Sequence, residues 1–389
     1  MTESAVVYTN EPDSAAAAHD LCRQVSAAMP GDPPDVLVLF ASPRYEHPVL
    51  LEQLQATCKP RILVGASSAG EFTSDQRGEG LCCVLAMRSK ELQFSAGVGT
   101  GLSRDRAAAA RAIVSDFRGL RSDSYAYRTA LVMTDALAGH ADDLVEQLTL
   151  ATAGKYQFFG GGAGDDAQFR RTQVFFGTEA LSDAAVALEI LSDKPLGVGV
   201  GHGWEPAGPP LRVTQAAGMN VISLNGLPAV EAMEEHARAT GQTFDAKSPL
   251  PFFLHNILGI DTGSGHRLRV PLAVLPDGAI ACASEIPAGA TVHVMRTNAN
   301  SAVEAATRAT RAALAGLGGH QPQVALFFDC VATRLRMGDA FGLELEGLAS
   351  TLGGATKFVG CNTHGQIARA PGQFGGFHNC TAVVCVLPA

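Results

Sequence analysis

Two spacings of apolar residues alternate along the chain. Runs of consecutive apolar residues, as at 36–41 and 81–87, are typical of buried strands. Apolar residues three or four positions apart, as at 14–29, indicate helices with one buried face. Because strands and helices alternate, we predict an α/β protein whose mixed sheets are flanked by helices.

The same order of elements occurs three times. Units with the order strand, helix, strand, helix, strand, strand begin near residues 5, 92 and 291, and each has a glycine loop directly after a strand. The loops read Gly-x4-Gly-Glu at 65–71, Gly-x3-Gly-Asp at 160–165 and Gly-x4-Gly-Gln at 360–366. We interpret this order as a threefold internal repeat of a β-α-β-α-β-β unit. Simple alternation, which any α/β protein shows, is the competing explanation.

A block of different character, 195–289, separates the second unit from the third. It predicts one helix at 228–239 and strands at 211–214, 268–275 and 279–285, with a hairpin turn at Pro276-Asp277-Gly278. Residues 241–251 are expected to form a linker or an exposed loop. The third unit is then predicted to open with a strand at 292–295, followed by a helix whose capping box is Ser301-x-x-Glu304.

Composition narrows the class of protein. With 47% hydrophobic and 17% charged residues, the chain can bury a large core and is not disordered. A net charge of −9 without a basic run argues against binding to nucleic acid. We expect no membrane span, because no apolar run approaches about 18 residues. The acidic first 14 residues do not resemble a signal peptide, and the cysteine spacings suggest no disulfide framework, so we expect a cytoplasmic protein.

Glycine alternates with larger residues at 197–204. In a strand, the four glycines lie on one face, and a flat ligand or another layer of the protein can approach the backbone there. His202 and Trp204 lie on the opposite face and are candidates for a polar group and a stacking wall in a pocket. The alternative for His202 is a core histidine bonded to the backbone.

The glycine loops are the strongest candidates for binding. Each follows a strand, where open α/β sheets place ligands, and Ser67 and Ser68 can add hydrogen bonds to those from backbone N–H groups. No Lys-Ser/Thr follows the second glycine, so the loops do not bind phosphate as P-loops do. The alternative is that they are turns packed against neighbouring backbone. Ser67, in a loose Gly-x-Ser-x-Ala motif, supports a hydrolase hypothesis, although no motif supplies its histidine base.

The spacing of cysteine and histidine residues indicates whether the chain has a metal site or a haem ligand. Cys361-x-x-His364 and His378-x-Cys380 superficially match a zinc site, but the zinc-knuckle pattern is missing and we assign no metal. Haem attached covalently is excluded because Cys-x-x-Cys-His is absent from the sequence. Haem bound non-covalently needs only one axial histidine. The candidates for that ligand are His202, His255, His364 and His378.

With these residues in place, the chain resembles the FIST family of bacterial sensory proteins over residues 35–388. The matching motifs are the loops 65–71 and 160–166, Gly201-His202-Gly203-Trp204-Glu205-Pro206, Leu254-His255-Asn256, Leu268-Arg269-Val270-Pro271 and Phe377-His378-Asn379-Cys380-Thr381. Two positions depart from the family pattern. Gln366 stands where a glutamate is usual, and the Cys-x-x-Arg pattern is stretched between Cys330 and Arg334.

The resemblance implies two intertwined sensory modules and a function. We expect a FIST N-terminal module at 35–215 and a FIST C-terminal module at 216–389, with the strand and helix of 1–34 completing the first unit. The family is proposed to bind small molecules such as amino acids, and its members act with histidine kinases or cyclases. A subset is thought to bind haem and sense nitric oxide. Because the modules fill this chain, we expect it to act on a partner in trans.

Four functional hypotheses follow. The first is a small-ligand sensor, the second a haem-based nitric oxide sensor, the third a serine hydrolase using Ser67, and the fourth a pure scaffold. We expect the pocket to lie where the glycine loops converge near the glycine-faced strand. We assign neither a ligand nor an oligomeric state. The candidate binding residues are Gly65, Ser67, Ser68, Gly70, Glu71, Gly162, Asp165, Asp166, His202, Trp204, His255, Asn256, Arg269, Cys361, His364, Gln366, His378 and Asn379.

Overall fold

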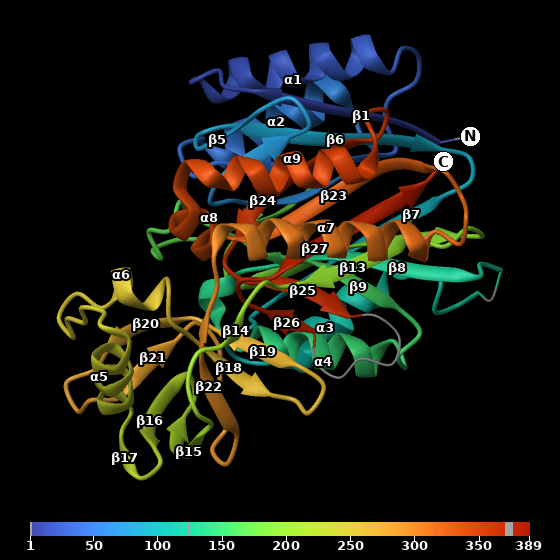
Figure 1. The fold of residues 1–389 in the computed structure, drawn as a ribbon. Helices are drawn as coiled ribbons and strands as arrows, with labels where there is room; N and C mark the ends of the chain where they lie inside the picture. Colours follow the sequence, from blue (N-terminus) through green and yellow to red (C-terminus); the bar gives the residue numbers. More distant parts are fainter. Residues whose placement is uncertain (1, 123, 370–375) are drawn as a thin grey trace.

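Three six-stranded sheets with one common strand order build the larger lobe of the molecule (Figure 1). A computed structural model describes residues 2–122, 124–369 and 376–389, and all statements on the fold refer to them. The first sheet contains, in spatial order, β1 (Thr2–Thr9), β6 (Cys82–Ser89), β2 (Val36–Ala41), β3 (Ile62–Ser67), β10 (Val174–Phe176) and β11 (Glu179–Leu181). The second contains β7 (Gln93–Thr100), β12 (Ala184–Ser192), β8 (Tyr127–Thr134), β9 (Gln157–Gly162), β25 (Gln366–Arg369) and β26 (Phe377–His378). The third contains β13 (Gly197–Gly201), β27 (Ala382–Pro388), β23 (Pro322–Cys330), β24 (Lys357–Thr363), β4 (Glu71–Thr73) and β5 (Arg77–Gly78).

Each sheet ends in a hairpin supplied by a distant part of the chain. The third and fourth strands of every sheet run parallel, and all other neighbours are antiparallel. The hairpin β10–β11 leaves the second sheet and pairs with β3 of the first. In the same way β25–β26 leaves the third sheet for the second, and β4–β5 leaves the first sheet for the third. The exchanged hairpins tie the three sheets into a ring.

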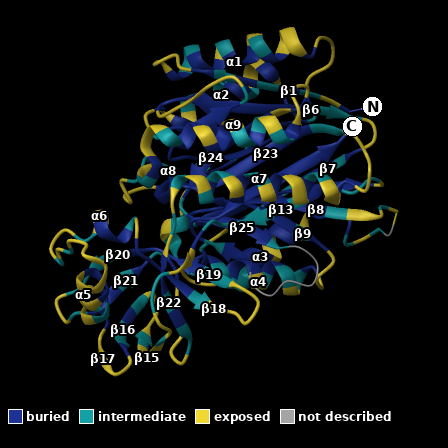
Figure 2. Cartoon of the chain, viewed as in Figure 1, coloured by how far each residue is buried: buried dark blue, intermediate teal, exposed yellow. Residues whose placement is uncertain are grey.

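The inner faces of the three sheets enclose one core, and helices cover the outer faces (Figures 1 and 2). Phe40, Phe159 and Phe328, one from each sheet, meet in this core, with ring centroids 5.5 Å apart for Phe40–Phe328 and 6.3 Å for Phe159–Phe328. Burying each aromatic ring contributes about 2–3 kcal/mol to the free energy of unfolding. The covering pairs are α1 (Ser14–Ala28) and α2 (His47–Cys58), α3 (Arg106–Ser115) and α4 (Ala141–Ala151), and α7 (Ala299–Gly316) and α9 (Phe341–Leu352).

A second, smaller lobe is inserted between β13 and α7 (yellow and light orange in Figure 1). Its described residues form a nine-stranded sheet and two helices around a separate core. The elements are β14 (Glu205–Pro206), β15 (Leu211–Ala217), β16 (Asn220–Leu224), β17 (Leu227–Pro228), α5 (Ala229–Thr240), α6 (Leu250–Phe253), β18 (Ile257–Asp261), β19 (His266–Arg269), β20 (Pro271–Val274), β21 (Ile280–Cys282) and β22 (Thr291–Arg296). The remaining short helices of the described chain are η1 (Ala136–Ala138), α8 (Val331–Met337) and η2 (Gly338–Ala340).

The predicted α/β class with mixed sheets is confirmed, but the predicted start of the third unit is wrong. The strand expected at 292–295 is β22, which pairs with β14, β15 and β18 inside the inserted lobe. The first strand of the third sheet is instead β13, paired with β27. The helix that follows begins earlier than the proposed capping box, because Asn298 accepts a hydrogen bond from Ser301 N at 2.9 Å and is the N-cap. The common strand order does not show a common origin of the units, so the internal repeat stays a prediction.

The glycine face of β13 receives a helix. A Cβ atom at Gly197 or Gly199 would overlap the carbonyl oxygen of Ala313 or Ala309 in α7. On β7, Gly97 and Gly99 are in the same position against the backbone of α3. Of the two expected uses of a glycine face, close packing of another layer is therefore the one found, and α7 occupies the space that a flat ligand would need.

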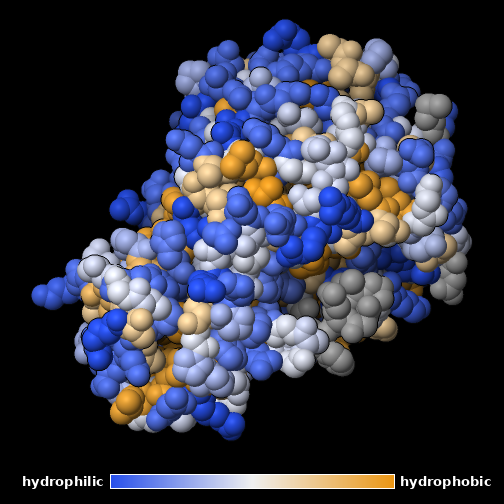
Figure 3. All heavy atoms as spheres, viewed as in Figure 1, coloured by the Kyte–Doolittle hydropathy of each residue, from blue (hydrophilic) through white to orange (hydrophobic). Residues whose placement is uncertain are grey.

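The surface and the cysteines add two findings. Hydrophilic residues cover most of the face shown in Figure 3, and among the described residues no helix is long and apolar enough to cross a membrane. Cys22 of α1 and Cys58 of α2 form a disulfide, which the sequence analysis did not anticipate because the two residues lie 36 positions apart. The other seven cysteines of the sequence are free and buried.

Substitution of Gly199 tests the contact between β13 and α7. Because the overlapping atom is a backbone oxygen, α7 must move to accept a methyl group, and we expect Gly199→Ala to lower the free energy of unfolding by about 3 kcal/mol. Gly354→Ala is the matched control, since a Cβ there has no neighbour within 4 Å, and it should change stability by less than about 0.5 kcal/mol. Urea denaturation measures both. Equal effects of the two substitutions would contradict this account of the glycine face.

Candidate functional site

The three glycine turns, defined as residues 65–71, 160–166 and 360–366, meet at the centre of the larger lobe. Backbone hydrogen bonds join each pair of turns: Gly164 N donates to Ser67 O at 2.8 Å, Ala69 N to Asn362 O at 3.0 Å and Gly162 N to Gly365 O at 2.8 Å. The turns follow β3, β9 and β24, so the carboxyl ends of these three strands point to one place.

Glycine is required in these turns because the backbones touch. A Cβ atom at Gly164 would lie 2.7 Å from Ala69 N, and one at Gly162 would lie 2.7 Å from His364 O. Gly70 and Gly365 also adopt positive φ angles of 120° and 96°, which residues with a side chain rarely take. The turns therefore leave no hollow between them, and the space for a ligand lies beside them.

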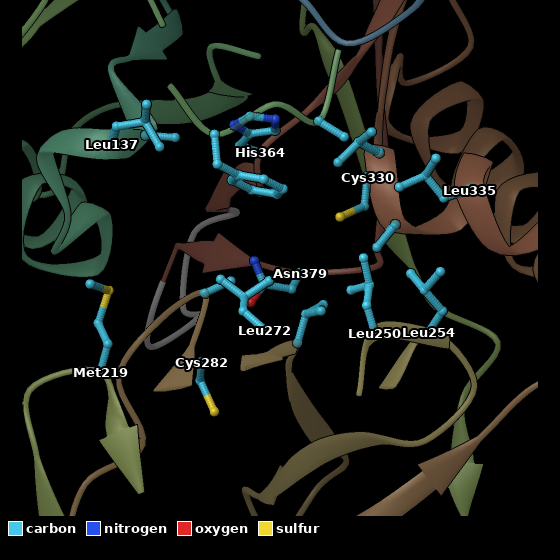
Figure 4. A pocket seen from close by; sticks show the side chains of 18 of the residues that line it. Leu137, Met219, Leu250, Leu254, Leu272, Cys282, Cys330, Leu335, His364 and Asn379 are labelled. Atoms are coloured by element: carbon cyan, nitrogen blue, oxygen red, sulfur yellow. The ribbon is translucent and has the colours of Figure 1, made fainter. Parts of the chain in front are cut away.

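A cavity of about 180 Å³ lies between the glycine turns and the inserted lobe (Figure 4). Its walls come from both lobes and are mainly apolar, as is usual for small-molecule sites. The larger lobe supplies Ala136, Leu137, Gly139, Ala167, Phe169, Cys330, Val331, Ala332, Leu335, His364, Gly365 and Asn379. The inserted lobe supplies Met219, Leu250, Leu254, Val270, Leu272, Cys282 and Ala283.

His364 is the main polar group of the cavity wall. Its side chain is 4% exposed, and neither ring nitrogen has a hydrogen-bond partner. The ring stacks on Phe169, with centroids 4.5 Å apart, and Nε2 lies 3.6 Å from Oδ1 of Asp165. Burial lowers the pKa of His364 to about 4 despite this carboxylate, so the imidazole is neutral at pH 7. The ring carries one unpaired donor and one unpaired acceptor beside the cavity.

Asn379 is the second polar group with unused hydrogen-bonding capacity. Its Nδ2 donates to His378 O at 3.2 Å, whereas the buried Oδ1 has no partner. Asp165 does not share this role, because its carboxylate accepts from the backbone N of Phe169, Arg170 and Arg171 at 2.9, 2.6 and 2.9 Å. The cavity therefore combines apolar walls with an imidazole and a carboxamide oxygen.

Comparison with known domain families identifies the chain. The FIST N domain matches residues 35–227, and the FIST C domain matches residues 229–369. The chain belongs to the FIST family. FIST domains are associated with sensory signal transduction and with the binding of small ligands.

Comparison with individual proteins adds little to the family. None of the curated proteins matches the chain. Among solved structures, the crystal structure of a cyanuric acid hydrolase from A. caulinodans aligns over 100% of both chains, at 8% sequence identity and a TM-score of 0.33. We infer no function from a similarity of this level.

A second hollow, of about 370 Å³, lies beside the glycine turns 65–71 and 360–366 of this FIST protein and is lined by more polar and charged side chains. Its lining residues include Glu71, Arg77, Glu79, Arg334, Asp339 and Asn362. Ser68 Oγ donates to Glu71 Oε1 at 2.5 Å, Leu81 N donates to Oε2 at 2.8 Å, and burial raises the pKa of Glu71 to about 8. Neither amide atom of Asn362 has a hydrogen-bond partner.

Of the predicted site residues, only some line these hollows. His364 and Asn379 line the apolar cavity, and Glu71 lines the polar hollow. His202 and Trp204 border a much smaller space near α7, of about 10 Å³. The glycine turns pack directly on one another, so the two hollows lie beside the turns and not between them, and α7 covers the glycine-faced strand, near which the pocket was also expected.

Several predicted residues are held in the protein by partners of their own. Ser67 Oγ accepts from Gln173 N at 3.0 Å, and Asn256 bonds His236, Gln242 and Phe252 O. Arg269 donates to Asp142 at 2.6 Å and to the carbonyl oxygens of Glu285 and Leu268. These groups join segments of the fold and do not line the cavity, which corrects the expectation that Ser67 and Arg269 face a ligand.

The remaining predicted residues are distributed through both lobes. Cys361 lies in the central core, Gln366 bonds Thr363 and Thr381 N, and His378 bonds Ala368 O. His255 is exposed on the inserted lobe, and Gly65 and Gly162 make close backbone contacts. Gly70 belongs to the glycine turn 65–71, and Asp166 accepts a hydrogen bond from Ser42 at 3.3 Å.

Sequence reasoning missed most of the cavity wall. Leu137 and Phe169 lie in the segments that follow β8 and β9, and Cys330 is the last residue of β23, so their position at or after a strand end was the one available signal. Met219 and Leu272 belong to the inserted lobe, and nothing in their sequence context distinguishes them from ordinary core residues. Only the packing of one lobe on the other brings them to the site.

The buried imidazole predicts a pH dependence of stability. The pKa of His364 is about 4 in the folded chain, below the ordinary value of about 6.5, so between these values the unfolded chain binds the proton more readily. The free energy of unfolding should therefore fall by up to about 3 kcal/mol as the pH falls from 6.5 to 4. His364→Gln should lose this component, whereas the exposed His320→Gln should follow the wild type. Urea denaturation between pH 4 and 7.5 tests this, and parallel curves for wild type and His364→Gln would refute it.

Proposed function

We propose that this FIST protein is a sensor whose ligand is a small, uncharged, mostly apolar molecule with one hydroxyl or amide group. The ligand occupies the cavity between the two lobes. The observation that carries this proposal is His364, a buried neutral imidazole with two unpartnered nitrogens in an otherwise apolar wall.

The size of the cavity supports a ligand with one ring. A cavity of about 150 Å³ is enough for benzene, and the cavity here is about 180 Å³. Larger drug-like ligands occupy about 300–1,000 Å³. A single ring with one or two substituents therefore matches the space.

The polar groups select the head group of the ligand. His364 can donate and accept one hydrogen bond, and Asn379 Oδ1 can accept one. A hydroxyl or amide pairs with such groups and carries no charge into the apolar wall, where an isolated charge is strongly unfavourable. A free amino acid is less well supported, because Arg269, the one arginine among the predicted binding residues, is paired with Asp142 and does not line the cavity.

The position of the cavity supports a signalling mechanism. Its walls come from both lobes, so a bound ligand contacts both and favours one orientation of the inserted lobe. Two ion pairs join the lobes beside it, Arg269–Asp142 at 2.6 Å and His140–Glu285 at 2.8 Å. A partner in trans, such as a histidine kinase or cyclase, would read the change in orientation.

Haem does not fit this cavity. His364 is chemically suited to be an axial ligand, because it is neutral and its ring nitrogens are unpartnered. A porphyrin is, however, several times larger than benzene, and about 180 Å³ cannot contain it. His202 and His378 are bonded to the carbonyl oxygens of His266 and Ala368. We therefore derive no step through haem.

Ser67 is poorly placed for hydrolysis. Its side chain accepts the hydrogen bond from Gln173 N, and it is 1% exposed. His47 Nδ1 hydrogen-bonds Oε1 of the same Gln173 at 2.9 Å, so the imidazole binds the side chain of the serine's partner and not the serine. We accordingly propose a binding role and no catalytic role for this chain.

Binding of p-cresol and toluene tests the proposed site. The two probes share a ring and a methyl group, and only p-cresol has a hydroxyl. We expect p-cresol to raise the melting temperature and to bind about ten-fold more tightly than toluene, because one hydrogen bond to His364 contributes about 1.4 kcal/mol. In His364→Ala the two affinities should become equal. Calorimetric titration measures the dissociation constants.

Filling the cavity provides the matched control. Ala283→Leu places a larger side chain in the cavity wall and should abolish binding of both probes, whereas Ala315→Leu, on the exposed face of α7, should not. Leucine and haemin belong in the same panel. Binding of p-cresol that survives Ala283→Leu, or a Soret band that His364→Ala removes, would overturn the proposed ligand class.

A further inference from the structure

Two free thiols meet at the wall of the cavity. Cys330 is the last residue of β23, and Cys380 lies between β26 and β27. They are 4% and 5% exposed, they pack in one hydrophobic cluster with Trp204, and each thiol shifts the acidity of the other. In Figure 4 the sulfur atom of Cys330 points into the cavity. A small molecule inside the cavity can therefore reach this sulfur.

The two thiols differ in acidity. The hydrogen bond from Cys380 lowers the pKa of Cys330 to about 7, although burial opposes this effect. The hydrogen bond to Cys330 and burial raise the pKa of Cys380 well above its usual range. Cys282 also lines the cavity, but its sulfur points away from it and burial raises its pKa to about 12. Among these three cysteines, Cys330 alone is substantially a thiolate at neutral pH, and the thiolate is the reactive form.

The backbone at Cys380 is held in an unfavourable conformation. Its φ angle is 47°, in the left-handed region that residues with a side chain seldom adopt. Hydrogen bonds on both sides maintain it, since Thr381 Oγ1 donates to Asn379 O at 2.7 Å and Thr381 N donates to Gln366 Oε1 at 3.2 Å. Such conformations persist where the surrounding structure enforces them, which is common at functional sites. Here the conformation keeps Cys380 against Cys330.

We propose that Cys330 and Cys380 form a redox-active dithiol that a small hydroperoxide, reaching it through the cavity, converts to a disulfide. The Cys330 thiolate attacks one peroxide oxygen, the O–O bond breaks, and the departing alkoxide takes a proton to become an alcohol or, from hydrogen peroxide, water. The resulting sulfenic acid on Cys330 is attacked by the sulfur of Cys380, which loses its proton, and the S–O bond breaks to release water. Two thiols are oxidised and one peroxide is reduced.

The disulfide would change the cavity wall. It withdraws the Cys330 sulfur from the cavity and cross-links the start of α8 to the turn that precedes β27. The inference depends on the cavity and the two thiols, and not on the ligand proposed above. Failure of p-cresol to bind would leave it intact, and failure of the oxidation would leave the ligand proposal intact.

Mapping of oxidised cysteines tests the proposal. The full chain is reduced, freed of reductant, treated with stoichiometric hydrogen peroxide, alkylated and digested for mass spectrometry. We expect peptides containing Cys330 and Cys380 to be linked, with Cys330 reacting at least about ten-fold faster than Cys282. Cys22 and Cys58 serve as an internal control for oxidation. Cys330 and Cys380 remaining alkylated while Cys22 and Cys58 become linked would overturn the proposal.

Single substitutions distinguish the cysteine that reacts with the peroxide, Cys330, from the cysteine that attacks the sulfenic acid, Cys380. In Cys380→Ala the sulfenic acid on Cys330 should persist and be trapped by dimedone, while Cys330→Ala should leave Cys380 unoxidised. Cys282→Ala is the matched control and should leave the linkage unchanged. Melting curves confirm that each variant is folded, and the mapping of the unmodified chain stands by itself if one variant is not. Equal dimedone labelling of Cys282 and Cys330 in Cys380→Ala would contradict the assignment.

Discussion

Direct contact between the backbones of the three glycine turns is the constraint on which the rest of the larger lobe depends. The hydrogen bonds Gly164 N to Ser67 O and Gly162 N to Gly365 O form only where no side chain separates the strands' ends. Once the turns touch, the hairpins that follow them are directed onto neighbouring sheets, as the pairing of β10 with β3 shows. Because the touching turns fill the centre of the larger lobe, the apolar cavity and the polar hollow lie at its two margins.

The two margins differ in chemistry because different segments cover them. On one side the inserted lobe brings apolar residues such as Leu272 over His364, and the imidazole is kept neutral. On the other side Arg334 and Glu79 form an ion pair above the buried Glu71. The apolar side is the better candidate for a sensory site, because only there do both lobes contribute to one cavity and a ligand can affect their relative orientation.

Local patterns predicted the strands, the helices and the importance of the glycine loops, because each of these depends on residues close in sequence. They predicted a separate block between the second and third units, but not that β13 belongs to the third sheet and β22 to the inserted lobe. They also did not predict the exchange of hairpins or the lining from Met219, which depend on segments far apart. Ser67 and Asp165 were good candidates by residue type, yet backbone N–H groups already satisfy them, from the distant Gln173 for Ser67 and from the next turn of chain for Asp165. His364 is the exception: it lies in a glycine turn and its ring nitrogens are unpartnered, and spacing alone could not distinguish it from His378.

The proposed ligand and the proposed oxidation use the same wall, and this imposes a relation between them. A molecule bound against His364 occupies the cavity into which the Cys330 sulfur points, so it excludes a hydroperoxide from that sulfur. If the disulfide in turn alters the wall that the ligand contacts, thermodynamic linkage requires each state to disfavour the other by the same free energy. Ligand binding and disulfide formation would then be alternative signals at one cavity, because the wall on which the inserted lobe rests is either ligand-bound or cross-linked.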